Sequence, residues 1–314
     1  MTSVLPFETA DVRGFLHRPD PQPDGGGAGL VLTHGAGGNC DAPLLVAVAT
    51  AFSAAGLCVL RCDLPFRQRR PSGPPSPAGA AADRAGLRAA VAALHGGDGT
   101  AGLRGVLASA RAFGADIVLL AGDTFDNHMV TGATIDRAGR LLADAGLPVV
   151  ILPGNHDPAT PDSIYVRGGF DRIANLAILG ITHDRALDFA ALELEIWGNA
   201  HRDYMDMVPL RDPPARAARW HIAMGHGHYE PPETWHNPLR PSWLISDDHI
   251  AATGADYLAL GHWDRAAQVG CGAVPAYYSG SPDYVHTVNL VRLTADGAVV
   301  VTREPVVRND LSGG

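Results

Sequence analysis

The sequence is poor in cysteine and lacks the segments that direct a chain into a membrane. The N-terminus has no basic segment followed by an apolar stretch, so it predicts no signal peptide. No apolar run approaches the roughly 18 residues that a membrane-spanning helix requires. No Cys-x-x-Cys pair and no disulfide framework is present among the four cysteines, Cys40, Cys58, Cys62 and Cys271. These absences predict a soluble protein without membrane partners, which we expect in the cytoplasm.

An excess of positive charge is also lacking. The chain has 24 Lys and Arg against 33 Asp and Glu, which gives a formal charge of −9. Long nucleic acid is therefore disfavoured as a partner, because neutralising many backbone phosphates requires many cations. One basic cluster, Arg67, Arg69 and Arg70, offers either local phosphate contacts or a solvated loop. The length of 314 residues allows one large domain or two modest ones and leaves the oligomeric state open.

Apolar runs and turn residues divide the chain into two parts, 1–95 and 96–314. In the first part we expect strands at 29–33 and 57–62 and helices over 42–55 and 80–94. The proline-rich stretch from Pro65 to Pro77 predicts a loop. The run from His95 to Gly99 breaks the chain, and helices, strands and loops then alternate in a new rhythm. Residues 285–307 predict a β-hairpin.

The first part contains VLTHGAGGN and LCVLRCDLPFRQRR, each beginning in a predicted strand. Over about residues 25–95 it resembles the front of a dienelactone-hydrolase-like α/β-hydrolase, in which the His-Gly-rich turn helps to form an oxyanion hole. The Gly-x-Ser-x-Gly turn that would carry the nucleophile is absent, and in the nearest string, Tyr278–Pro282, a proline stands where a helix should continue. We therefore interpret this part as a β-α-β packing scaffold, with carboxylesterase chemistry as a minor alternative.

Four short strings in the second part each follow an apolar run that predicts a β-strand. The runs are DIVLLA, VVILP, WHIAM and DYLAL, and the strings are Gly122-Asp123, Gly154-Asn155-His156-Asp157, Gly225-His226 and Gly261-His262-Trp263-Asp264. In α/β sheets, the ends of strands gather distant residues around one point. Carboxylate, amide and imidazole groups together suit divalent transition metals. The four strings therefore predict a metal site.

Taken together, the four strings resemble the ligand motifs of the calcineurin-like metallophosphoesterases. Tyr278-Ser279-Gly280-Ser281-Pro282 is similar to the branch that contains DNA-repair exonucleases. The resemblance covers about residues 96–314 and implies an α/β fold in which helices flank a β-sandwich, with a dinuclear centre at the strand ends. We expect the N-terminal β-α-β segment to add strands to this sheet, so that a fusion of two truncated folds forms one merged unit.

The resemblance implies two metal positions. Asp123 would serve both positions, and Asn155, His226 and His262 would complete the first. Asp264 would belong to the second position, where the family usually has a histidine. Divalent Mn, Fe, Zn or Ni suits such ligands, and the oxygen of Asp264 favours Mn.

Other polar residues have roles beside the metals. The resemblance implies that His156 stabilises the phosphoryl group or protonates the leaving oxygen, that Asp157 orients His156, and that a metal-bound hydroxide attacks. His228 is a tentative additional ligand. We expect His128 to cap a helix or line the pocket rim, with a ligand role as the alternative, and His201 to belong to a loop.

One motif of the resembled family is missing, an Asp-x-His at the end of a first strand. Upstream of Gly96 the chain has AAVAALH instead. If the strands at 29–33 and 57–62 join the sheet beside Asp123, then Asp63, or His34, would approach the metals. We treat these two residues as tentative surrogate ligands, and water in the same position is the alternative.

The sequence as a whole predicts a metal-dependent phosphoesterase. Small phosphodiesters such as cyclic nucleotides or activated aryl diesters are favoured as substrates, and an incompletely ligated centre predicts broad specificity. The alternatives are a non-catalytic or single-metal fusion remnant and a carboxylesterase.

Overall fold

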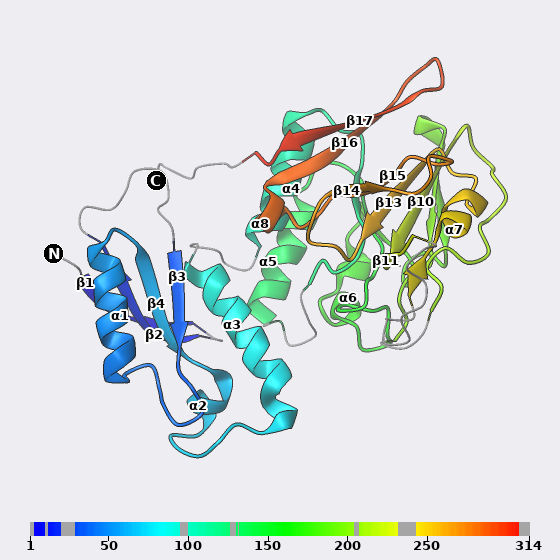
Figure 1. Cartoon of the computed structure of the whole chain (residues 1–314). Helices are drawn as coiled ribbons and strands as arrows, with labels where there is room; N and C mark the ends of the chain where they lie inside the picture. Colours follow the sequence, from blue (N-terminus) through cyan, green and yellow to red (C-terminus); the bar gives the residue numbers. More distant parts are fainter. Residues whose placement is uncertain are drawn as a thin grey trace. The chain divides into compact units, whose positions relative to one another are not determined.

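The protein has a mixed α/β fold that divides into two compact units, Met1–Gly99 and Thr100–Gly314 (Figure 1). The structure is a computed structural model, which describes residues 3–9, 12–19, 29–94, 100–125, 130, 132–203, 207–231 and 243–307. No helix in these ranges combines the length and the apolar character needed to cross a bilayer.

The first unit is built on a four-stranded sheet. Its elements are β1 (Ser3–Glu8), β2 (Arg13–Arg18), β3 (Gly29–Thr33), α1 (Pro43–Ala54), β4 (Cys58–Asp63), α2 (Pro65–Arg69), η1 (Pro77–Gly79) and α3 (Ala80–Leu94). The strand order is β1-β2-β4-β3, with β3 parallel to β4 and the other pairs antiparallel. In the described part of the chain, these strands pair only with one another. The expectation that this segment adds strands to the sheet of the second unit was therefore wrong.

Within this unit, the predicted strands and long helices are confirmed to within about a residue at each end. The loop predicted from Pro65 to Pro77 was wrong in its first residues, because Pro65 begins α2. Proline is tolerated at the first helical position, where its missing N–H has no helical partner in any case.

Arg67 of α2 is 4% exposed, and its guanidinium group donates to four backbone carbonyls. The acceptors belong to two loops, Ala36 at 2.6 Å and Gly38 at 2.7 Å in one, and Arg70 at 3.3 Å and Gly73 at 3.2 Å in the other. The side chain therefore ties the glycine-rich turn to the segment that follows α2. Four of its five N–H groups are used in these bonds and the side chain is 4% exposed, so Arg67 is poorly placed for the phosphate contact considered for it.

The second unit contains two larger sheets and shorter pairs of strands. Its elements are α4 (Ala101–Ala112), β5 (Val118–Leu120), α5 (Gly132–Ala143), β6 (Val149–Ile151), α6 (Ile164–Arg167), η2 (Phe170–Arg172), β7 (Leu176–Ile178), β8 (Ala186–Phe189), η3 (Ala190–Leu192), β9 (Leu194–Gly198), β10 (Trp220–His226), β11 (His228–Tyr229), β12 (Leu244–Ile245), α7 (Asp247–Ala252), β13 (Tyr257–Gly261), β14 (Ala267–Val269), β15 (Ala276–Tyr278), α8 (Pro282–Val285), β16 (Thr287–Leu293) and β17 (Val299–Pro305).

The two larger sheets each contribute two of the strands that precede the metal-site strings. One is a parallel three-stranded sheet, β5-β6-β7, and the other has the order β14-β15-β13-β10-β9-β8 with parallel pairs at its centre. All four strands that the sequence predicts before the strings are present. The site is therefore assembled from the strand ends of two sheets.

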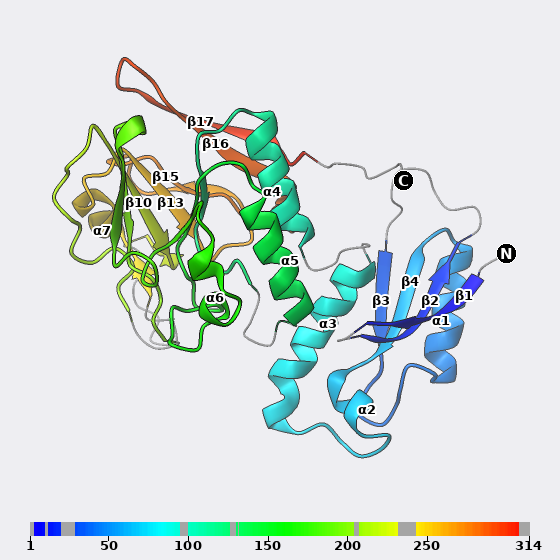
Figure 2. The same ribbon diagram turned by 180° about the vertical axis from the view of Figure 1, so that it is seen from behind.

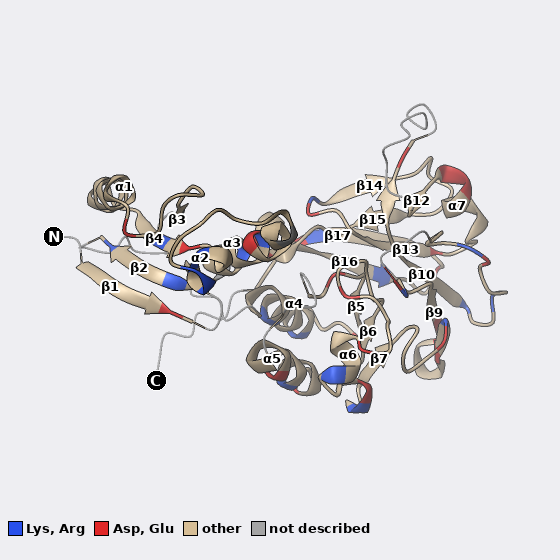
Figure 3. Ribbon diagram, turned by 90° about the horizontal axis from the view of Figure 1, so that it is seen from below, with Lys and Arg blue, Asp and Glu red and all other residues tan. Residues whose placement is uncertain are grey.

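Successive side chains of a strand point to opposite faces of its sheet, so the clusters that they join show how the sheets are layered. Ile151 of β6 joins a buried cluster with α4 and α5, whereas its neighbour Val150 joins a second cluster with Met224 of β10. Ala223, the preceding residue of β10, joins a third cluster with Ile250 of α7. The three-stranded sheet thus lies between α4 with α5 and the six-stranded sheet (Figure 3).

The predicted C-terminal hairpin is confirmed as the antiparallel pair β16–β17. The hairpin and the residues after it run beside α4 (Figure 1 and Figure 2). Val307 N donates to the buried Ser109 Oγ of α4 at 2.8 Å, and a Cβ on Gly105 would overlap Val306. Residues 306 and 307 therefore pack on α4.

Replacing Arg67 should loosen the first unit. Arg67→Met keeps the apolar stem but removes four hydrogen bonds to backbone carbonyls of two loops, and we expect a loss of about 3 kcal/mol of stability. The measurement is amide hydrogen exchange of residues 29–94 together with denaturation followed by circular dichroism, because all five tryptophans come after residue 99. Arg69→Met is the control, since Arg69 is exposed and, in the part of the chain that the structure describes, its side chain donates only to Pro65 O. Equal exchange in both variants would contradict the role of Arg67.

Candidate metal centre

The strings at the ends of β5, β6, β10 and β13 meet because glycines allow the backbones to come close. Gly122 has φ +90°, and a Cβ there would overlap the ring of His226. A Cβ on Gly154 would overlap the Asp123 carboxylate and its backbone nitrogen. Glycine is therefore required at these two positions because the groups of the other loops come too close for a side chain, in addition to any role in turns.

Asp123, Asn155, His226 and His262 converge at this point, as the sequence predicts. Asp123 Oδ2 lies 3.2 Å from His226 Nε2, and Asn155 Oδ1 lies 3.0 Å from the same nitrogen. Asn155 Oδ1 also lies 3.3 Å from His262 Nδ1. One possible ligand atom from each of Asp123, His226 and His262 falls within 4.8 Å of the other two.

His226 presents a ring nitrogen to two oxygens that cannot donate to it. The side chain is fully buried, and Nδ1 lies 2.8 Å from the carbonyl oxygen of Ala121, which can only accept a hydrogen bond. In the neutral ring, Nδ1 therefore carries the hydrogen and Nε2 has a lone pair. That lone pair faces oxygens of Asp123 and Asn155. Either a proton or a metal cation must lie between them to make the arrangement favourable.

The pKa values of the site residues are set by burial and by the same close contacts. Burial acts to lower the pKa of His226, but the hydrogen bond and the charge of Asp123 outweigh it and raise that pKa. Burial acts to raise the pKa of Asp123, yet His226 and His156 bring it down to about 2. Burial, with the nearby His226, lowers the pKa of His262 to about 4, so this imidazole is neutral and able to bind a metal at neutral pH.

Asp123 and His262 also adopt backbone conformations that non-glycine residues rarely take. Their φ angles are +52° and +103°. Such conformations cost on the order of 1–3 kcal/mol each and occur mostly where function requires them. Both residues are candidate ligands, so the strain coincides with the convergence of the ligand atoms.

Asp157 is buried, and four donors surround its carboxylate. Oδ1 accepts from Gly154 N at 2.7 Å and from Asp123 N at 3.2 Å, while Oδ2 accepts from Phe125 N at 3.1 Å and from Tyr165 Oη at 2.6 Å. Burial and the charge of Asp123 raise the pKa of Asp157. The ring of His156 is not among its donors, so the contact that would orient His156 is not made. Asp157 instead holds together the loops after β5 and β6.

His156, Asp264 and His228 lie around this centre. The backbone N–H of His156 donates to Asp123 Oδ1 at 2.9 Å, and its side chain is half-buried. Asp264 is exposed and stands outside the three-residue metal cluster found among the described residues, as does His228. Both line an open cavity of about 410 Å³, together with His262, Trp263 and Arg265. His128 lies outside the described residues.

Two residues of the site were not predicted from the sequence. Tyr165 of α6 is fully buried and donates to Asp157, and no local pattern marks it. His201, assigned to a loop, is also fully buried, and its Nε2 lies 2.9 Å from the carbonyl oxygen of His226. Its backbone bonds to Pro153 and Ala159 of the neighbouring loop. The string Gly198-Asn199-Ala200-His201, which imitates a ligand motif, was the only signal in the sequence.

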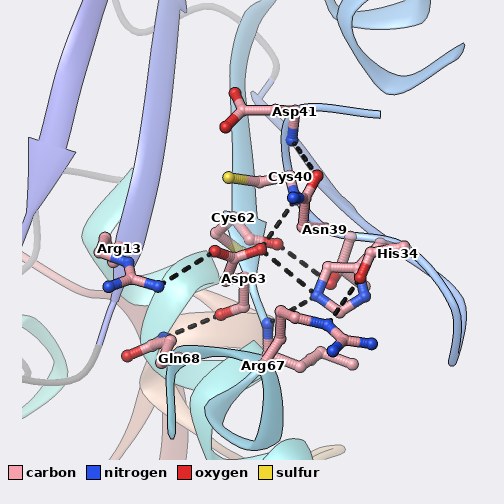
Figure 4. Close-up of polar contacts among 12 residues, drawn as sticks. Arg13, His34, Asn39, Cys40, Asp41, Cys62, Asp63, Arg67 and Gln68 are labelled. Carbon is pink, nitrogen blue, oxygen red and sulfur yellow. Dashed lines mark hydrogen bonds and ion pairs between the residues drawn. The ribbon is translucent and has the colours of Figure 1, made fainter. Parts of the chain in front are cut away.

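The tentative surrogate ligands Asp63 and His34 are engaged within the first unit (Figure 4). Asp63 Oδ1 accepts from Cys40 N at 2.7 Å, and Oδ2 lies 3.4 Å from Arg13. His34 Nε2 accepts from Leu64 N at 3.2 Å, and Nδ1 donates to Gly35 O at 2.9 Å. Among the described residues, neither belongs to the metal cluster.

The donor set fits a divalent cation. Neighbouring ligand atoms around a cation at about 2.0–2.2 Å are roughly 3.3–3.6 Å apart in a tetrahedral site, so the spacings of 3.0 to 3.3 Å found here would have to widen by only a few tenths of an ångström. A carboxylate, an amide oxygen and two imidazoles suit Mn, Fe, Zn or Ni. The Nδ1 bond of His226 to a backbone carbonyl is the support that metal-binding histidines usually have.

Solved structures with low similarity to this chain include the protein TT1561 of Thermus thermophilus. It is 14% identical, with a TM-score of 0.45, over 66% of this chain and 93% of that one. A dienelactone hydrolase from Anabaena variabilis is 16% identical, with a TM-score of 0.23, over 57% of this chain and 85% of that one. An alpha-beta serine hydrolase homologue from Coxiella burnetii is 16% identical, with a TM-score of 0.21, over 57% and 88%. Similarity this low shows nothing about the activity of this chain.

No curated protein matches the chain. A family model, that of the calcineurin-like phosphoesterases, matches residues 89–265. This range is more than half of the chain and contains all four strings of the metal centre. The chain therefore belongs to the calcineurin-like phosphoesterase family.

Proposed function

We propose that this chain is a phosphodiesterase of broad specificity that prefers Mn²⁺, with cyclic nucleotides or activated aryl diesters as substrates. Family membership supports a metal-dependent hydrolase of phosphoric esters in general. The observation that carries the proposal is His226 Nε2, whose lone pair faces the oxygens of Asp123 and Asn155. The open cavity beside it, about 410 Å³, leaves room for substituents on both sides of a phosphate.

The ligands of the proposed cations follow from the contacts. Asp123, Asn155, His226 and His262 would hold the first cation, and Asp123 with Asp264 a second. When bound, the cations would lower the pKa of a water so that it can attack phosphorus, and would neutralise the phosphate oxygens.

The surrounding residues would position the reacting groups. The bond from His156 N to Asp123 Oδ1 fixes the carboxylate, and we propose that the half-buried His156 ring donates a proton to the leaving oxygen. Asp157 keeps the loops of Asp123 and Asn155 together through its four donors. His201 holds the peptide that follows His226 in place. We also propose that the chain belongs to the branch of the family that contains DNA-repair exonucleases, and that it arose as a fusion of two truncated folds.

The alternative of a carboxylesterase has little support in the first unit. Both ring nitrogens of His34 are already hydrogen-bonded, to Gly35 O and Leu64 N, so this histidine is not free to act as a base. The non-catalytic remnant is favoured by one observation only, that the sequence lacks the first Asp-x-His motif. It predicts that the protein binds at most one cation and hydrolyses nothing.

Removing the metal should remove the activity. We expect hydrolysis of para-nitrophenyl phenyl phosphate to stop after chelation and to return with Mn²⁺. Asp123→Asn should lower kcat/KM by about a thousandfold, or roughly 4 kcal/mol of barrier, because it weakens a ligand of both cations. Metal content and rate are measured on the same samples.

Asp188→Asn is the matched control, since Asp188 is exposed on β8 and should leave rate and metal content unchanged. A metal-stimulated rate that survives in Asp123→Asn contradicts the mechanism. No rate with any divalent metal favours the remnant, and a carboxyl-ester hydrolysis that resists chelation favours the esterase.

Tyr165 should matter for metal affinity although it is not a ligand. Tyr165→Phe removes one of four donors to the buried Asp157, so the loops that carry Asp123 and Asn155 are held less firmly. We expect the Mn²⁺ affinity to fall roughly tenfold, measured by calorimetry and by the Mn²⁺ dependence of the rate. Tyr284→Phe, at a side chain 65% exposed, is the control. Equal affinities in the two variants would remove Tyr165 from the site.

A further inference from the structure

The loop after β13 presents an arginine beside the metal centre. Arg265 is exposed and lines the same open cavity as His262, Asp264 and His228. Its guanidinium carbon lies 4.3 Å from the centre of the Trp263 ring. An arginine stacked on an aromatic ring keeps its planar array of donors but loses part of its freedom to move. The guanidinium group is therefore partly ordered at the edge of the cavity.

Trp263 is itself held from more than one side. Its Nε1 donates to His228 Nδ1 at 3.0 Å, and its ring stacks on Tyr278 at 4.3 Å with an interplanar angle of 12°. Tyr278 is fully buried, and its hydroxyl donates to Gly227 O at 2.7 Å and accepts from Tyr229 N at 2.9 Å. The ring under Arg265 is thus part of a hydrogen-bonded platform that reaches the loop after His226.

The backbone of the arginine loop is fixed as well. Ser281 N donates to Asp264 O at 3.0 Å. Gly280, at φ +78°, lies so close to residues 264–266 that a Cβ would overlap their backbone. The string that follows β15 therefore buttresses the loop that carries Arg265.

Arg265 has no carboxylate partner within the described ranges. Other arginines of the second unit form ion pairs, Arg202 with Asp184, Arg216 with Asp256 and Arg219 with Glu193. No ion pair or hydrogen bond of the Arg265 guanidinium group occurs among the described residues. An ordered guanidinium group without a partner, at the mouth of a cavity, is suited to bind an anion with two parallel hydrogen bonds.

We propose that Arg265 forms an anion subsite, and that the preferred substrates are phosphodiesters that carry a second phosphate or carboxylate on the group that stays bound. This inference rests on the proposed function and adds the substrate class. The scissile phosphate would lie at the metal centre, and the second anion would lie against Arg265. Asp264 lines the same cavity and repels anions, so the subsite is expected to be strongest when a cation at the centre offsets that charge.

The test compares substrates that share one leaving group. Para-nitrophenyl phenyl phosphate and para-nitrophenyl meta-carboxyphenyl phosphate both release para-nitrophenolate, and only the second carries the extra anion. We expect kcat/KM to be about tenfold higher for the carboxylated diester, equivalent to about 1.4 kcal/mol. The ratio should fall as ionic strength rises, because the subsite is exposed.

Substitutions test whether Arg265 and Trp263 cause the higher kcat/KM for the carboxylated diester. Arg265→Gln should reduce the tenfold preference to about twofold, and Trp263→Leu, which removes the ring beneath the guanidinium group, to an intermediate value. Arg292→Gln is the control, because Arg292 is exposed on β16 and, among the described residues, its guanidinium group donates only to the Thr302 hydroxyl. A preference that persists in Arg265→Gln, or that is absent from the unmodified protein, overturns the proposal.

A binding measurement separates this proposal from the proposed function. The Mn²⁺-loaded protein is titrated calorimetrically with phenylphosphonate and with meta-phosphonobenzoate, and benzene-meta-diphosphonate distinguishes phosphate from carboxylate. We expect the two ligands with a second anionic group to bind about tenfold more tightly than phenylphosphonate, and Arg265→Gln to remove that difference. If the difference is present but neither diester is hydrolysed, the proposed function fails and the subsite stands. Equal affinities, or hydrolysis of both diesters at equal rates, refute the subsite alone.

Discussion

The hydrogen bond between His226 Nδ1 and the carbonyl of Ala121 joins two strand ends that belong to different sheets. Ala121 follows β5 of the three-stranded sheet, and His226 ends β10 of the six-stranded sheet. The bond selects the ring nitrogen that faces Asp123 and Asn155. A shift of one sheet along the other by an ångström or so would break it, because hydrogen bonds tolerate only a few tenths of an ångström. The apolar cluster between the sheets therefore controls the chemistry of the site by fixing their register.

Much of the candidate site could be predicted because each candidate ligand lies in a recognisable local sequence pattern. At each string an apolar run, a glycine and a polar residue lie within about ten residues of chain, so the four strings could be located without knowledge of the fold. The choice of Asp123, Asn155, His226 and His262 as candidate ligands came from the resemblance to the family. Which of the four strands share a sheet was not predicted. It depends on which strands pair, and the pairing of β5 with β6 and of β10 with β13 involves long-range contacts that a local pattern does not encode.

Other features were missed for separate physical reasons. Tyr165 reaches Asp157 only because α6 packs beneath the loop, and the sequence gives no sign of that packing. Strand β1 contains Pro6, which argues against a central strand, but β1 lies at the edge of its sheet, where proline is tolerated. The resemblance implied that Asp157 orients His156. A buried carboxylate needs several hydrogen-bond donors, and three of those of Asp157 are backbone amides.

The missing first motif has a structural counterpart in the sheet that contains Asp123. Among the described strands, β5 is at the edge of the three-stranded sheet, and the segment at 80–94 that precedes it is the helix α3 of the other unit. Among the described residues, no strand beside β5 brings a side chain to the centre from that edge. One cation would then be held by four side chains, and a second by Asp123, Asp264 and water. If a second cation binds, Asp123 and Asp264 would be its side-chain ligands, two against the four of the first cation, so it would exchange more readily and oxygens of the substrate would help to retain it.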